Sequence, residues 1–299
     1  KHMETKEERR AHKRRQRGRN KAKFVVRLQD MVDRAREEHD AFNRFPTNKL
    51  QEGNKTLFDW RSMPGTLDPK VFNLPGIRGD RKRLQCESFA RALYPIITEL
   101  HKKLNRKVRI VDFGSGTGNA SLPLAYWFRN VAVFTLVERY PVPSSVSKKR
   151  ATDAGLENVE CIAQYIHEWK NAKIHFDIGF SSHACGSATD DALMACLDIG
   201  ASFVLVSCCV GKLKFVDENV LLPRSNWMRS IFSREEFLEI SRAGDHSLKD
   251  YSEESSEWKR DCKLLLEIDR LELAKESLME YELHLSKLDP LDCSPKNDI

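Results

Sequence analysis

The sequence predicts an α/β fold in which a mostly parallel, seven-stranded sheet carries helices on both faces. Two observations predict it. Short apolar segments of strand length alternate with helical patterns over residues 106–299. In addition, the β-branched run at 108–111 ends in Asp112 and leads directly into a glycine-rich turn and a helical pattern from Leu122. Strands that alternate with helices are typical of parallel sheets, because each parallel connection needs a crossover.

The charge of the chain is concentrated at its N-terminus. Residues 1–36 hold 14 Lys/Arg and 5 Asp/Glu, a net charge of +9, whereas the remainder holds 36 and 39, a net charge of −3. We therefore divide the chain into a basic helical arm (1–45), a lead-in loop with a covering helix (46–105) and the core (106–299), which contains an insert at 211–260. Such an arm favours RNA as a partner, because Lys and Arg bind phosphate without sequence choice. A solubilising or targeting extension is the alternative.

One apolar helical face is expected within the arm: Phe24, Leu28, Met31, Val32 and Ala35.

Composition also sets the expected compartment. No run approaches about 20 consecutive apolar residues, so we expect no membrane span. The eight cysteines include no Cys-x-x-Cys pair. This favours reduced thiols inside the cell, with the cytoplasm as the first expectation and the mitochondrion or nucleus as alternatives. Because no metal-ligand spacing is present, we expect no metal site.

The glycine-rich turn is the central motif. It reads Asp112-Phe-Gly-Ser-Gly-Thr-Gly118, with one residue between successive glycines, whereas a dinucleotide fingerprint has two residues between its last glycines. Glycine is needed where the chain turns sharply and a ligand approaches the backbone. The next predicted strand, 131–138, ends in Glu138, and an acid at that position can bind ribose hydroxyls.

The remaining elements follow in order. A helix after the basic triplet 81–83 is expected to cover the sheet edge, so Gln85 and the triplet could reach one end of the ligand. The tip of the third strand, Gln164 and Tyr165, lies where a base would be recognised. Further strands are expected at 176–180, 201–207 and 282–286, with a long helix at 264–279 and the start of another strand at 294–299.

Two short motifs follow the fourth and fifth strands, at the sheet edge where ligands bind. They read Ser182-His-Ala-Cys-Gly186 and Ser207-Cys-Cys-Val210. His183 is the obvious group in them that can accept a proton near neutral pH. The cysteines at 185, 208 and 209 could act as nucleophiles, as zinc ligands or as packing residues. We take His183, Cys185 and Cys208 as the candidate catalytic residues.

These motifs carry a resemblance to known enzymes. The glycine-rich turn resembles motif I of the S-adenosylmethionine-dependent methyltransferases. The strings His183-Ala-Cys-Gly-Ser-Ala-Thr-Asp190, Ser207-Cys-Cys209 and Ser294-Pro-Lys-Asn297 are similar to the methyltransferase domain of the glutathione S-transferase C-terminal domain-containing proteins. A looser similarity links the first string to the tRNA acceptor-stem 2′-O-methyltransferases. Enzymes that make 5-methylcytosine in RNA by covalent attack also carry cysteines after these strands, but with Pro where this chain has Ala184.

The resemblance implies a Rossmann-like methyltransferase fold and S-adenosylmethionine as the cofactor. The expected function is methyl transfer to RNA, either tRNA or rRNA. A small molecule or a protein side chain is the alternative acceptor, and a cofactor-binding ribonucleoprotein assembly factor without turnover is the alternative from another class. The expected cofactor-binding residues are Gln85, Asp112, Gly114, Ser115, Gly116, Gly118, Glu138, Arg139, Gln164 and Tyr165.

Overall fold

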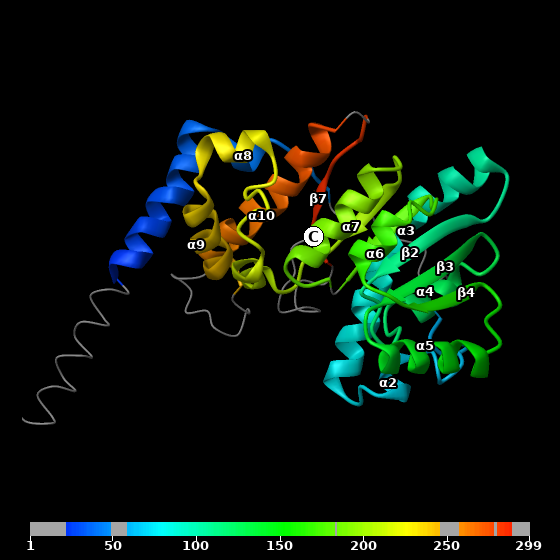
Figure 1. Ribbon diagram of the computed structural model, residues 1–299. Helices are drawn as coiled ribbons and strands as arrows, with labels where there is room; N and C mark the ends of the chain where they lie inside the picture. Colours follow the sequence, from blue (N-terminus) through cyan, green and yellow to red (C-terminus); the bar gives the residue numbers. More distant parts are fainter. Residues whose placement is uncertain (1–21, 49–58, 183, 246–256, 278–279, 289–299) are drawn as a thin grey trace, which may run out of the picture.

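The fold combines an α/β part with a helical part that lies beside it (Figure 1). The computed structural model describes residues 22–48, 59–182, 184–245, 257–277 and 280–288. In Figure 1 the α/β part is drawn in cyan to green, and the helical part contains the blue N-terminal helix and the yellow to orange helices α8, α9 and α10.

The α/β part is built on a five-stranded parallel sheet. Its strands are β2 (Val108–Phe113), β3 (Ala132–Glu138), β4 (Val159–Ala163), β5 (Ile178–Ser181) and β6 (Ser202–Leu205). Their order is β4-β3-β2-β5-β6. The chain therefore builds outward from β2 to β4 and then returns to place β5 on the other side of β2. Ligands of open parallel sheets bind at such a reversal, beyond the carboxyl ends of the strands.

Helices cover both faces of this sheet, as the alternating pattern predicts. On β2, Ile110 joins the core beneath one set of helices, whereas Val111 and Phe113 join the core beneath the other. This alternation follows from the two-residue repeat of a strand. The first face is covered by α3 (Ile77–Leu104), α4 (Ser121–Trp127) and α5 (Pro141–Asp153), and the second by α6 (Ile166–Asn171) and α7 (Ser187–Leu197).

The helical part has a hydrophobic core of its own. Residues 22–33 are helical, and the buried Leu28, Met31 and Val32 pack with residues from η4, α8, α9 and α10. The basic arm is therefore packed from residue 22 onward, and the first half of the 211–260 insert belongs to this same core. None of the described helices is both long and apolar enough to cross a membrane. The bounds are η1 (Arg34–Glu38), η2 (Ala41–Asn43), η4 (Val210–Phe215), α8 (Asn226–Ile231), α9 (Arg234–Gly244) and α10 (Glu257–Lys275).

A buried network of charges joins the two parts. Arg270 of α10 donates to Asp190 of α7 at 2.8 Å and to Glu267 at 2.9 Å. Arg224 donates to the second oxygen of Asp190 at 2.7 Å. Glu267 also accepts a hydrogen bond from Ser207, at the end of β6. Every charge in the network is paired, which is the condition under which buried charges are tolerated.

The seven-stranded sheet expected from the sequence is not formed by the described residues. The segment 282–286 contributes only the two-residue strand β7 (Leu285–Ser286), which pairs in parallel with β1 (Thr47–Asn48) in a separate sheet. Residues 294–299, expected to begin a last strand, lie outside the described residues. The short segment α2 (Pro69–Phe72) completes the elements.

Candidate active site

The glycine-rich turn follows β2 and bends tightly over the end of β3. The amides of Gly114 and Ser115 donate to the carbonyl of Val137 at 2.9 and 3.2 Å. Gly114, Gly116 and Gly118 have φ angles of 81°, 57° and 77°, in the left-handed region that favours glycine. A Cβ on Gly118 would lie 2.7 Å from Leu122, whereas a Cβ on Gly116 would meet nothing within 4 Å. The open space beside Gly116 allows a ligand to approach the backbone.

Glu138 connects this turn to the end of β3. One carboxylate oxygen accepts a hydrogen bond from the amide of Gly116 at 2.9 Å, and the other accepts one from the amide of Tyr140 at 3.0 Å. Glu138 is largely buried, and the two backbone amides hold its carboxylate in a fixed orientation. Each carboxylate oxygen has a second lone pair, so both can still accept a hydroxyl.

Asp112 is a buried acid at the end of β2. It accepts a hydrogen bond from Ser121, while its Oδ1 atom is buried and has no hydrogen-bond partner. Burial raises the pKa of Asp112 to about 7, an effect that the Ser121 hydrogen bond and the positive charge of Lys82 oppose. Lys82 in turn donates to Gln85 at 3.1 Å. Gln85 on α3 is therefore next to a residue whose charge acts on Asp112.

Arg150 on α5 was not anticipated from the sequence, yet it supports the same turn. Its guanidinium donates to the carbonyl of Thr117 at 2.5 Å and to the side chain of Asn119 at 2.8 Å. It also donates to the carbonyls of Thr66 and Leu67 in the lead-in loop, at 2.7 and 3.2 Å. Burial lowers the pKa of Arg150 to about 10. A single arginine in a helix with many polar residues gives no local signal of such a role.

The other predicted cofactor residues lie around this centre at different depths. The hydroxyl of Ser115 is buried without a hydrogen-bond partner. The backbone amide of Gln164 donates to the backbone carbonyl of Glu138 at 3.0 Å. Arg139 and Tyr165 are exposed. The guanidinium of Arg139 lies 4.3 Å from the ring centre of Tyr140. Asp112, the three glycines, Ser115 and Glu138 therefore lie at or directly beside the turn after β2, and their role in cofactor binding stays a prediction.

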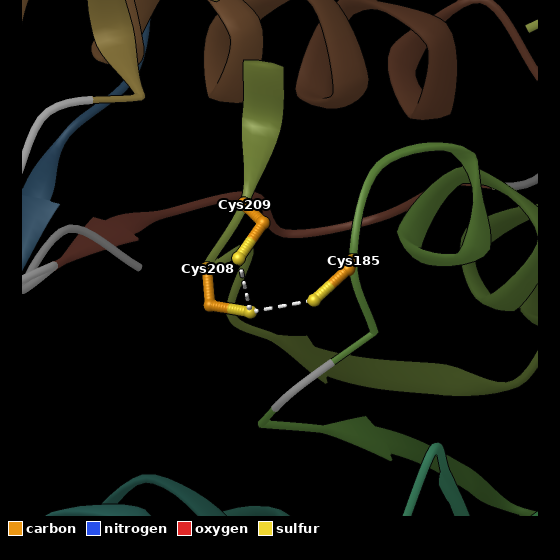
Figure 2. A group of neighbouring side chains, drawn as sticks. All are labelled: Cys185, Cys208 and Cys209. Carbon is orange, nitrogen blue, oxygen red and sulfur yellow. Dashed lines mark hydrogen bonds between the residues drawn. The ribbon is translucent and has the colours of Figure 1, made fainter. Parts of the chain in front are cut away.

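The structure brings the predicted cysteines together at the ends of β5 and β6. The Sγ atoms of Cys185 and Cys208 are 3.1 Å apart, and those of Cys208 and Cys209 are 3.7 Å apart (Figure 2). His183 lies outside the described residues. Its neighbour Ala184 is fixed by a hydrogen bond from its amide to Ser181 at 3.1 Å.

The environment of the cluster makes the thiol of Cys185 more acidic than that of Cys208. A hydrogen bond from Cys208 lowers the pKa of Cys185 to about 6, and the neighbouring Cys209 and Lys212 act in the same direction. The pKa of Cys208 is raised, mainly because it donates this hydrogen bond and because it is buried. A thiolate at Cys185 is therefore available near neutral pH, as either a nucleophile or a ligand.

The raised pKa of Asp112 predicts a pH-dependent cost to folding. The folded state favours the protonated form of Asp112. The contribution of this group to the free energy of unfolding is therefore fully present at low pH and is lost as the pH rises through about 7. Asp112→Asn keeps the shape and removes the titration. Its free energy of unfolding relative to the wild type should therefore rise by about 2–3 kcal/mol between pH 5 and pH 8.

Urea unfolding of both proteins at the two pH values measures this difference. Asp198→Asn, at an exposed position, controls for the loss of one carboxylate. An equal difference between Asp112→Asn and the wild type at pH 5 and pH 8 would show that Asp112 is already ionised in the folded protein.

Comparison with known proteins shows which proteins this part of the chain is similar to. Residues 81–215 match the family model described as a methyltransferase domain. The chain is 29% identical over 241 residues to the human glutathione S-transferase C-terminal domain-containing protein, covering 81% of this chain and 36% of that protein. It is 30% identical over 263 residues to the Drosophila melanogaster homologue, covering 86% and 42%. The chain thus spans about two-fifths of the length of these relatives.

Solved structures show more distant similarity. The methyltransferase PaMTH1 of Podospora anserina, bound to S-adenosylhomocysteine, is 14% identical, with coverage of 72% of this chain and 80% of that chain and a TM-score of 0.40. This score is too low to add to the assignment, which rests on the family match and on the turn after β2. The methyltransferase domain expected from the sequence is confirmed over residues 81–215, which match the methyltransferase-domain family model.

Proposed function

We propose that the chain transfers a methyl group from S-adenosylmethionine to RNA. The observation that carries the transferase part is the hydrogen bond between Gly116 and Glu138, which joins the glycine-rich turn to an acid at the end of β3. The RNA part rests on the charge of the N-terminal arm. The two parts of the proposal are separable, and separate experiments test them.

The residues at the ends of β2 and β3 fit this cofactor. Glu138 keeps free lone pairs for the two ribose hydroxyls, and the space beside Gly116 admits the nucleoside. At the other end of the cofactor, the unpartnered oxygen of Asp112 is suited to an ammonium group. Lys82 and Gln85 on α3 are the groups near Asp112 that are suited to its carboxylate.

S-adenosylmethionine supplies a methyl group bonded to a positively charged sulfur. The contribution of the protein is to align the acceptor with that methyl group and to take up the proton that the acceptor loses. The loop between β5 and α7 is next to the turn after β2 in the order of the sheet. We assign the proton-accepting or orienting role to His183, which the sequence places in that loop, and we keep Cys185 and Cys208 as the other candidate catalytic residues.

The N-terminal arm supports RNA as the acceptor. Residues 1–21 contain 10 Lys/Arg and 3 Asp/Glu, so this segment has a net charge of +7. Further along the arm, Arg27, Arg34 and Arg36 form ion pairs with Glu239, Glu236 and Asp261. These pairs attach the helix to the body of the protein. The net charge of +7 in residues 1–21 is of the sign that binds phosphate.

A second candidate acceptor is a small molecule or a protein side chain. The net charge of −3 over residues 37–299 favours it, because a catalytic face that binds RNA is often basic. The third candidate is a ribonucleoprotein assembly factor that binds the cofactor without turnover. It shares the site of the other two and differs only in the absence of methyl transfer.

The acceptor is identified by incubating the protein with methyl-labelled cofactor and with separated RNA, protein and metabolite fractions of a cell extract. We expect label in the RNA fraction, sensitive to ribonuclease and resistant to protease. His183→Gln should lower the rate by about 10²–10⁴-fold if the side chain acts as a general base.

Each other outcome has a defined meaning. Label in the protein or metabolite fraction alone would contradict RNA as the acceptor and support the second candidate. Cofactor binding without label in any fraction would contradict methyl transfer and support the third.

The arm is tested by deleting residues 1–21, which leaves the packed helix at 22–33 in place. RNA affinity should fall, and the dependence of log K on log salt concentration should become shallower by about 0.7 for each phosphate of a single strand that the shortened protein no longer neutralises. Fluorescence anisotropy with a labelled RNA at several salt concentrations measures both quantities.

A variant of the full chain separates charge from length. Changing Lys13, Arg14, Arg15 and Arg17 to Gln should reproduce part of the fall in affinity, because counterion release depends on charge. Unchanged affinity and salt dependence in both variants would contradict a role for the arm in RNA binding.

A further inference from the structure

Three thiols from two separate loops meet at one edge of the sheet. Cys185 follows β5, whereas Cys208 and Cys209 follow β6, and their side chains point toward one another (Figure 2). Their Sγ atoms all lie within 4.8 Å of one another, with separations of 3.1 Å for Cys185–Cys208 and 3.7 Å for Cys208–Cys209. All seven cysteines in the described part of the chain are free thiols.

These separations match the spacing of ligands around one metal ion. In tetrahedral zinc sites the Zn–S distance is about 2.3 Å, so two ligand sulfurs are about 3.8 Å apart. The Cys185–Cys208 and Cys208–Cys209 separations, 3.1 and 3.7 Å, are somewhat shorter than that value, and all three sulfurs lie within 4.8 Å of one another. Small rotations of the side chains are therefore enough to place them around one ion. We propose that Cys185, Cys208 and Cys209 form a zinc site with three thiolate ligands.

The degree of burial separates these cysteines from the packing cysteines of the same protein. Cys86, Cys196 and Cys262 are fully buried, and Cys196 fills the space against Gly179 on β5. The cluster is only half-buried, so an ion can reach it from solvent. Cys161 is half-buried as well, but it lies on β4, away from the cluster. Packing therefore explains the first group and does not explain the meeting of three thiols from two loops.

Hydrogen bonds hold both cysteine loops in position. The carbonyl of Cys209 accepts from the amides of Gly186 and Lys212 at 3.2 and 3.3 Å, which links the loop after β5 to the loop after β6. Ser207 is fixed by the buried Glu267. Loops that are already in place lose little conformational entropy when an ion binds.

The charge and the number of ligands are consistent with a bound divalent ion. Three thiolates and one Zn²⁺ have a net charge of −1, and the positive charge of Lys212 acts on Cys185. Within the described residues, the cluster consists of these three ligand groups.

Cobalt titration of the full chain tests the proposal. The reduced protein is first dialysed against a chelator and then titrated with Co²⁺ alone, while the thiolate-to-metal absorption band is recorded. We expect one Co²⁺ per chain and disappearance of the band when Zn²⁺ is added. Replacing a ligand should weaken binding by at least about tenfold, because changes to groups that merely support a ligand already cost 10–100-fold.

The variants are Cys185→Ser, Cys208→Ser and Cys209→Ser, and Cys161→Ser is the matched control. Circular dichroism in the presence of chelator checks that each variant is folded. The proposal requires the band to be absent or weakened in the three cluster variants and retained in Cys161→Ser. Absence of the band in the wild type, or equal Co²⁺ affinity in folded Cys185→Ser, Cys208→Ser and Cys209→Ser, would overturn it.

Discussion

The hydrogen bond between the amide of Gly116 and the carboxylate of Glu138 is the interaction on which the rest of the candidate site depends. It holds a turn of three left-handed glycines over the end of β3, where Gly114 and Ser115 donate to the carbonyl of Val137, directly before Glu138. A backbone amide and a buried carboxylate form a strong, charge-assisted pair. The pair therefore brings the glycines and the acid, which are 22 positions apart in the chain, to one place.

Residues around this centre act mainly by fixing loops. Arg150 connects the turn after β2 with the lead-in loop through four hydrogen bonds to Thr66, Leu67, Thr117 and Asn119. Asp190 lies on α7, the helix that follows β5, and connects this helix to α10 through a hydrogen bond from Arg270. Asp190 is the last residue of the sequence motif that begins at His183. The end of this motif therefore has a structural role, which is to connect α7 to α10. The same buried network fixes Ser207, directly before the paired cysteines.

Local sequence was sufficient to predict the parts of the structure that depend on local conformation. The glycine spacing, the β-branched run before Asp112 and the acid at Glu138 each report on a single turn or strand end, and the structure places them as expected. The apolar face of Leu28, Met31 and Val32 was likewise predictable from its helical repeat. The residues that this face packs against were not predictable, because they come from η4, α8, α9 and α10, more than 170 positions later in the chain.

The features that local sequence did not predict have a common physical origin. The segment 282–286 has the composition of a strand, but pairing with β1 rather than with the main sheet is decided by tertiary contacts. The two cysteine motifs were expected at one edge of the sheet, but the contact between Cys185 and Cys208 depends on β5 and β6 being neighbours, which spacing along the chain does not reveal. The role of Arg150 depends on two loops that precede it by more than 30 positions. His183 lies outside the described residues, so its predicted role stays a prediction.

Calorimetric titration with S-adenosylhomocysteine tests the central claim most directly. We predict one binding site per chain, with affinity lowered about tenfold or more in Glu138→Gln, since a hydrogen bond to a charged group contributes about 1.5–3 kcal/mol. Glu160→Gln, an exposed position on the neighbouring strand β4, should bind as the wild type does. No measurable affinity of the wild type for this nucleoside or for S-adenosylmethionine would contradict the assignment of the site, and so would equal affinity in Glu138→Gln and the wild type.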